Sequence, residues 1–133
     1  MTRSNHQLAR EFFAALSTGR LSSQFFTDDM TAWTTTSGKS PKEKYLAGVR
    51  MLQSLFPTGL TYTIDTLTAE EDRVAAEVQS RGTLVNGESF HNVYLFMLRI
   101  RDGRIASVAE HFNPQIVREK IVPLLQAAQP KPP

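Results

Sequence analysis

The chain has 133 residues, with 15 Lys plus Arg, 13 Asp plus Glu and no cysteine. This is long enough for one domain with a buried core, and it excludes disulfides, thiolate catalysis and cysteine-ligated metals. The basic residues behind the net charge of +2 are scattered, which argues against a nucleic-acid partner. Neither a signal-peptide core nor an apolar run of the ~18 residues that a membrane span needs is found. We therefore expect a cytoplasmic protein that binds no membrane.

The first half of the chain predicts helices that alternate with strands. Ser4 resembles a helix cap, and the apolar residues that follow recur at helical spacing until Gly19 ends the first helix. A short helix is expected at 21–26 and a strand at 30–36, where β-branched residues gather. Ser40 is the expected cap of a second helix, with Pro41 at its first position. A strand of alternating residues follows at 60–68.

The second half predicts a meander of three long strands between Arg73 and Phe112. Its two tight turns are Val85-Asn86-Gly87 and Asp102-Gly103, since Asn-Gly and Asp-Gly supply the positive φ that hairpins need. Asn113-Pro114 predicts the start of a last helix that Pro123 kinks or shortens. Residues 129–133, QPKPP, are expected to form a disordered tail. We thus expect one α+β domain over 1–128, with helices on the concave face of a bent, mostly antiparallel sheet and a pocket in the resulting cone.

The long strand at 89–101 is apolar on both of its faces. Phe90, Tyr94 and Phe96 lie on one face, and Val93 and Leu95 on the other. A sheet with one face in solvent would carry polar residues there, so we expect a second subunit to cover the outer face and form a homodimer. In the preceding strand, hydrophobicity favours the set with Val74 and Val78, rather than the set with Glu77 and Gln79, as the buried one.

Two segments carry a family resemblance. FFAALSTGRLSSQFFTDDMTAW near the N-terminus and NGESFHNVYLFMLRIRDGRIASVAEHFNP later in the chain are similar to the family that includes nuclear transport factor 2, ketosteroid isomerase, limonene epoxide hydrolase and the SnoaL-type polyketide cyclases. The resemblance implies a cone-like α+β barrel that is usually dimeric through its sheet, with a pocket between sheet and helices.

The catalytic residues of two branches of that family do not carry over. The isomerase base and its two oxyanion groups match Thr34, Phe12 and Phe96 here. In the epoxide hydrolases, the water-holding Tyr and Asn match Ala32 and Thr34, and the Arg-x-Asp pair matches Glu77-x-Gln79. Only their last-strand acid keeps a carboxylate, at Glu110. The resemblance therefore implies neither of those two mechanisms.

Matching to the family gives a set of expected site residues and overrules hydrophobicity for the Glu77 strand. Glu110 is the expected catalytic residue. Two carboxylates in an apolar cone, Glu77 and Glu110, would repel each other and resist ionisation, so that one of them could titrate near neutral pH. The expected substrate-binding residues are Thr34, Glu77, Gln79, Phe90, Asn92, Tyr94, Phe96, Val108 and Phe112. The alternative for Glu77 is an ion pair with Arg81 or another arginine at the sheet rim.

The register of the last hairpin decides whether Glu110 enters this cone. The Asp102-Gly103 turn pairs Arg101 with Arg104, which without a shift places Glu110 opposite Leu95 on the outer face. We therefore expect a bulge or longer turn near 101–104 that moves Glu110 beside Tyr94 or Phe96.

Two functions remain open from the sequence. One is an acid/base enzyme, without cofactor or metal, that acts on a small hydrophobic molecule with a carbonyl, epoxide or enol. The other is a non-catalytic binding module for a hydrophobic small molecule or a protein partner. The fold hosts both classes and does not choose between them.

Overall fold

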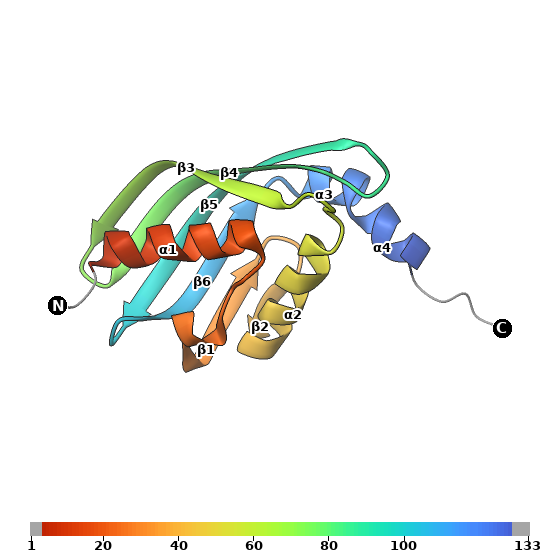
Figure 1. Ribbon diagram of the computed structural model, residues 1–133. Helices are drawn as coiled ribbons and strands as arrows, with labels where there is room; N and C mark the ends of the chain where they lie inside the picture. Colours follow the sequence, from red (N-terminus) through yellow and green to blue (C-terminus); the bar gives the residue numbers. More distant parts are fainter. Residues whose placement is uncertain (1–3, 129–133) are drawn as a thin grey trace.

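The computed structural model describes residues 4–128 and shows helices on one side of a curved sheet (Figure 1). The elements in chain order are α1 (Asn5–Thr18), the 3-10 helix η1 (Ser23–Phe25), β1 (Phe26–Thr34), β2 (Gly38–Pro41), α2 (Lys42–Gln53), β3 (Leu60–Glu70), β4 (Arg73–Thr83), β5 (Ser89–Arg101), β6 (Arg104–Phe112), α3 (Pro114–Lys120) and α4 (Val122–Ala128). The predicted tail at 129–133 lies outside the described residues.

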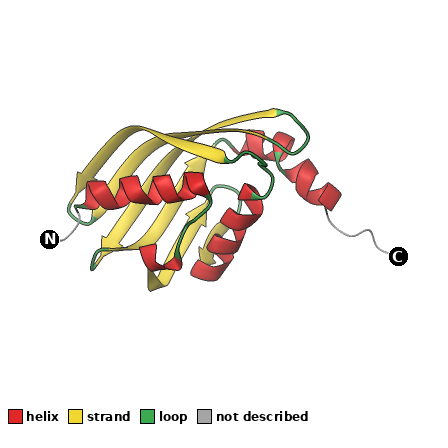
Figure 2. Cartoon of the chain, in the orientation of Figure 1, coloured by secondary structure: helices red, strands yellow, loops and turns green. Residues whose placement is uncertain are grey.

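The six strands form one sheet in the order β2-β1-β6-β5-β4-β3. Neighbouring strands run antiparallel except β1 and β6, which are parallel. The sheet stays open at its edges and bends around α1 and α2, which lie on its concave side (Figure 2). The predicted α+β class and bent sheet are confirmed.

Most helix ends follow the local sequence signals. The Ser4 hydroxyl accepts a hydrogen bond from the Gln7 amide at 3.1 Å, and Gly19 ends α1 with a φ of 70°. The last helical stretch is interrupted near Pro123, so that α3 and α4 are separate and Ile121 lies between them, as the proline predicts.

The predicted cap of the second helix is wrong. Ser40 lies in β2, where it pairs with Ala32 of β1, and Pro41 is the N-cap without a side-chain hydrogen bond. The short strand had no signal of its own in the sequence. Pairing with β1 extends the ladder through Ser40, and the helix begins one residue later than predicted, at Lys42.

The predicted register shift in the last hairpin is confirmed, a few residues away from where it was expected. Arg101 pairs with Arg104, but beyond Ile100 the pairing shifts, with Arg99 opposite Ser107 and Ala106 as the extra residue. The positive φ of Asp102 (52°) and of Gly103 (74°) makes the turn itself tight. The shift places Glu110 opposite Phe96, as predicted.

The core lies between α1 and the concave face of the sheet. Phe13 of α1 meets Phe96 of β5 edge to face, with 4.8 Å between ring centroids, and Phe12 lies 6.3 Å from the same ring. A second apolar cluster joins Ile121, between the last two helices, to Phe56 and Phe90. Together these two clusters account for most of the buried apolar residues on the concave side.

Candidate functional site

Glu110 is a carboxylate on the concave face of β6. It lies between Thr34 of β1 and Phe96 of β5, and Val108, two residues away on the same face, is buried. The residue is only partly exposed, and its main-chain carbonyl accepts hydrogen bonds from Thr35. Its carboxyl oxygens, by contrast, have no hydrogen-bond partner among the described residues. Burial without such a partner raises the pKa of the Glu110 carboxyl from 4.5 to about 8.

Three tyrosines share the electrostatic environment of Glu110. They come from different elements: Tyr45 from α2, Tyr62 from β3 and Tyr94 from β5. Burial raises the pKa of each phenol, and the nearby Glu110 carboxyl raises all three further. The phenols are therefore neutral hydroxyl groups at any physiological pH, able to donate a hydrogen bond.

The hydroxyls of these tyrosines differ in how they are engaged. The Tyr94 hydroxyl forms a 2.7 Å hydrogen bond with that of Ser80, which is fully buried, and its ring lies 5.8 Å from that of Tyr62. Tyr45 is 5% exposed, and its hydroxyl is the one buried side-chain polar atom without a partner in the part of the chain that the structure describes. An interior with one free carboxyl and one free phenol can receive a ligand that completes their hydrogen bonds.

Most of the residues predicted to bind substrate lie on this concave face. Thr34 is in register with Glu110, although its hydroxyl is engaged by the Ser37 amide at 3.0 Å. Asn92 is buried and uses its amide for the Asn113 carbonyl and the Val93 amide. The predicted residues found on the concave side are Thr34, Phe90, Asn92, Tyr94, Phe96, Val108 and Phe112.

Phe90, although on the predicted face, lies apart from Glu110. It packs with Phe56 in the second apolar cluster, with 5.3 Å between ring centroids, six residues along β5 from Phe96. The structure therefore groups Glu110 with Phe96 and Tyr94 rather than with Phe90.

The predicted placement of Glu77 and Gln79 on the pocket face is wrong. β4 pairs with β5 without a shift, so these residues lie opposite Leu95 and Val93 on the convex, outer face. Val78 and Ser80 are the buried residues, as hydrophobicity alone had indicated. The Thr66 hydroxyl donates to Glu77 at 2.6 Å, whereas Arg81 reaches Gln79 instead of forming the ion pair considered for Glu77.

Sequence reasoning missed Tyr45, Tyr62 and Ser80 as members of the site. Tyr45 falls on the apolar stripe of its helix, where a tyrosine looks like any packed aromatic residue. The alternation of β3 indicated that Tyr62 faces one side with Leu60 and Ile64, but the register with β4 that sets Tyr62 opposite Ser80 was needed to find the contact with Tyr94.

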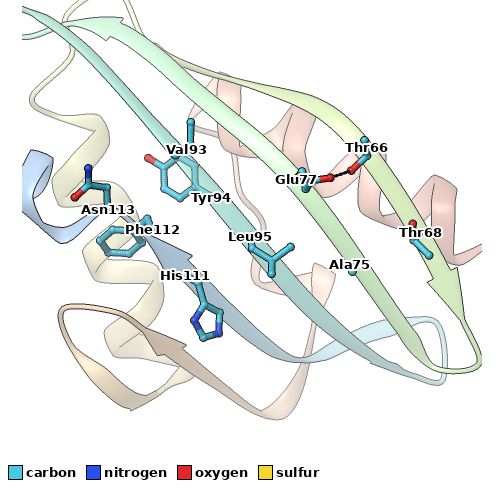
Figure 3. A pocket seen from close by; sticks show the side chains of 10 residues that line it. All are labelled: Thr66, Thr68, Ala75, Glu77, Val93, Tyr94, Leu95, His111, Phe112 and Asn113. Atoms are coloured by element: carbon cyan, nitrogen blue, oxygen red, sulfur yellow. Dashed lines mark hydrogen bonds between the residues drawn. The ribbon is translucent and has the colours of Figure 1, made fainter.

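Two surface hollows lie on the outer face of the sheet. One, with a volume of about 630 Å³, is bordered by Glu77, Val93, Leu95 and His111 (Figure 3). A neighbouring hollow of about 420 Å³ shares Leu95 and His111 and reaches Trp33, whose ring lies 4.6 Å from that of His111. The apolar pocket predicted inside the cone stays a prediction.

The described residues contain neither a membrane-spanning helix nor a metal-binding cluster. No helix in residues 4–128 is long and apolar enough to cross a membrane. No cluster of His, Asp and Glu with metal-binding geometry is found in the same range, and the expectation of a metal-free protein stays a prediction.

Comparison with known proteins identifies the fold. The model of a SnoaL-like domain matches residues 9–108, and no curated protein matches the sequence. An NTF2-like protein from Anabaena variabilis is 24% identical, with a TM-score of 0.72 over 85% of this chain and 94% of that one. An epoxide hydrolase of M. tuberculosis described as LEH-like is 15% identical, with a TM-score of 0.70 over 92% of this chain and 96% of that one. At these identities the neighbours establish the fold and leave the chemistry open.

Proposed function

This chain belongs to the SnoaL-like domain family, and from that premise we propose that it is a cofactor-independent acid/base enzyme that acts on a small hydrophobic substrate. Glu110 is the proton-transfer residue in this proposal. The protein works in the cytoplasm, and its substrate carries a carbonyl, epoxide or enol group.

The observation that carries the proposal is the free carboxyl of Glu110 in a largely apolar interior. General acid/base catalysis is most effective when the pKa of the catalytic group lies near the working pH. With a pKa of about 8, the Glu110 carboxyl is mostly protonated at pH 7 and still supplies a carboxylate fraction. A surface glutamate would be fully ionised at neutral pH, and its carboxylate would be a much weaker base than that of Glu110.

The neutral tyrosines supply the second half of the chemistry. Proton removal next to a carbonyl places negative charge on the carbonyl oxygen, and fixed hydroxyl donors in a water-poor site stabilise that charge. Phenols are already protonated at neutral pH, and burial together with the Glu110 carboxyl raises the pKa values of Tyr45, Tyr62 and Tyr94 further. The interior thus combines a proton-transfer group with hydroxyl donors.

The test needs no knowledge of the natural substrate. Acetophenone and 2-cyclohexen-1-one are incubated with the protein in deuterated buffer, and incorporation of deuterium next to the carbonyl is followed by mass spectrometry. We expect exchange above the buffer rate with the wild-type protein and a loss of about 100-fold or more in Glu110→Gln.

Glu77→Gln is the matched control, because it neutralises a carboxylate on the outer face of the same sheet. It should exchange as the wild type does. Exchange by Glu110→Gln at the wild-type rate, or no exchange by the wild-type protein with either ketone, would rule against the proposed proton transfer.

A non-catalytic binding module is the second candidate, and one observation favours it. Phe12 and Phe96, which stand at positions of the isomerase oxyanion groups, are fully buried and packed together in the core. An interior built this way can hold an apolar ligand without chemistry. Saturable binding of an aromatic hydrocarbon without deuterium exchange into any ketone would favour this candidate.

A further inference from the structure

The Tyr45 hydroxyl is buried, yet it has no hydrogen-bond partner among the described residues. The side chain is 5% exposed and its oxygen contacts no hydrogen-bonding group among residues 4–128. Native proteins pair almost all buried polar atoms, so an unpaired one indicates either strain or a partner that is not part of the chain. A phenylalanine would fill the same volume without leaving an unpaired hydroxyl.

The Tyr45 side chain packs against the strand that neighbours Glu110. The Tyr45 ring meets Phe26 edge to face at 6.3 Å, and α2 packs on β1, the strand that pairs with β6 at Glu110. The Glu110 carboxyl is the strongest charge acting on the Tyr45 phenol. The two groups without hydrogen-bond partners therefore lie in the same part of the interior.

The hydroxyls of the other two tyrosines of the interior, Tyr62 and Tyr94, already interact with other groups of the protein. Tyr94 is bonded to Ser80 and interacts with Tyr62 through their hydroxyls. Tyr45 is the phenol left to donate a hydrogen bond to an incoming group. A phenol bonds best to an accepting oxygen, and the carboxyl beside it is placed to exchange a proton with a neighbouring atom.

We propose that Tyr45 binds the carbonyl oxygen of the substrate while Glu110 exchanges a proton with the adjacent carbon. This inference rests on the proposed function, because it takes the interior beside Glu110 as the place of the substrate. The Glu110 carboxylate removes a proton from that carbon, the C–H electron pair forms a carbon–carbon double bond, and the carbonyl oxygen becomes an enolate oxygen bound by the Tyr45 hydroxyl. Return of a proton from the Glu110 carboxyl to carbon completes the exchange. The substrate class is accordingly a small apolar ketone or aldehyde with a hydrogen next to the carbonyl.

The test uses two probes of nearly equal shape that differ in the oxygen. Acetophenone has a carbonyl where α-methylstyrene has a carbon–carbon double bond. We expect the wild-type protein to bind acetophenone at least ~10-fold more tightly, because a buried donor left unpaired penalises the hydrocarbon. Tyr45→Phe should bind both probes about equally, and titrations followed by NMR measure the two dissociation constants.

Stability measurements separate a binding role from a structural one. Tyr45→Phe should melt at or above the wild-type temperature, because it removes an unpaired hydroxyl and keeps the ring. The matched control Tyr94→Phe removes a hydroxyl bonded to Ser80 and should melt at a lower temperature. A clear loss of stability in Tyr45→Phe would overturn the inference, since the hydroxyl would then already have a partner in the protein.

Glu110→Gln distinguishes this inference from the proposed catalysis. Its deuterium exchange should be lost while its preference for acetophenone is retained, since Tyr45 is intact. Preference without exchange in the wild type would refute the catalysis and support the oxygen site. A wild-type protein that shows no preference for the ketone, whether both probes bind or neither does, or a Tyr45→Phe variant that keeps the preference, would overturn the inference.

Discussion

At the scale of single residues, the energetics of Glu110 make folding stability depend on pH. The folded carboxyl has a pKa of about 8 against an ordinary value of 4.5. Between these values the folded protein keeps a proton that the unfolded chain has lost, so stability falls as pH rises from about 4.5 to 8. Each pH unit across the window corresponds to about 1.4 kcal/mol at most. Because Glu110 is partly exposed, we expect a total loss on the order of 2–4 kcal/mol.

Urea unfolding at pH 5, 6.5 and 8 measures this dependence, with Glu110→Gln as the comparison. The variant should be less sensitive to pH and more stable than the wild type at pH 8. The hydrogen bond from Arg101 lowers the pKa of Asp29, and that from Lys120 lowers the pKa of Glu88, so both titrate below the window. Parallel curves for the two proteins would show that Glu110 is ionised in the folded state at all three pH values.

The site could be predicted in part, and the reasons are specific to each residue. Glu110 was found because it matches the last-strand acid of the resembling family, which required a register shift that the Asp102-Gly103 turn alone does not give. Glu77 was misplaced because a family position was transferred in place of the strand's own alternation, which was correct. Tyr45 was out of reach, since only three-dimensional packing reveals that its hydroxyl lacks a partner.

At the scale of elements, β4 depends on a glycine where it meets the loop before β3. A Cβ at Gly82 would lie 2.8 Å from the Gly59 carbonyl oxygen and 2.8 Å from a ring carbon of Phe56. The backbone oxygen cannot yield as a flexible side chain would, so Gly82→Ala should destabilise the protein by about 1–3 kcal/mol in urea unfolding.

Gly48 in α2 is the matched control for the same substitution. A Cβ there meets nothing within 4 Å, and alanine favours a helix more than glycine does, by about 1 kcal/mol. Gly48→Ala should therefore be as stable as the wild type or more so. Equal stability of the two variants would mean that the approach of Gly82 to Gly59 is not close in solution.

Elements with strong local signals could be predicted, and those made by pairing could not. The Ser4 cap and the Asp102-Gly103 turn are set by residues a few positions apart. β2 exists because Gly38–Pro41 meets β1, and the sequence of this segment suggests a helix start rather than a strand. Its hydrogen bonds depend on a partner, which local patterns do not describe.

At the scale of the whole molecule, the outer face of the sheet carries large apolar residues that no other described part of the chain covers fully. Val93 is 52% exposed and Leu95 is 47% exposed, and both point away from the core (Figure 3). Trp33 lies on the same face beside His111. Such a surface favours burial against a second copy, and we expect a homodimer through this face.

Leu95→Asp should shift the protein from dimer to monomer or cause aggregation, because it places a charge in the centre of the face. Val85→Asp is the control: Val85 is 52% exposed, but it lies in the turn between β4 and β5. Sedimentation velocity at micromolar concentration should show the control as a dimer. A monomeric wild-type protein under these conditions would contradict the expectation.

The central claim is that Glu110 titrates near neutral pH inside the folded protein, and carbon-13 NMR of the glutamate carboxyls tests it most directly. The Glu110 signal is assigned by its absence in Glu110→Gln and is followed from pH 3 to 10. An inflection near pH 8 is the predicted result. An inflection near the ordinary value of 4.5 would contradict it.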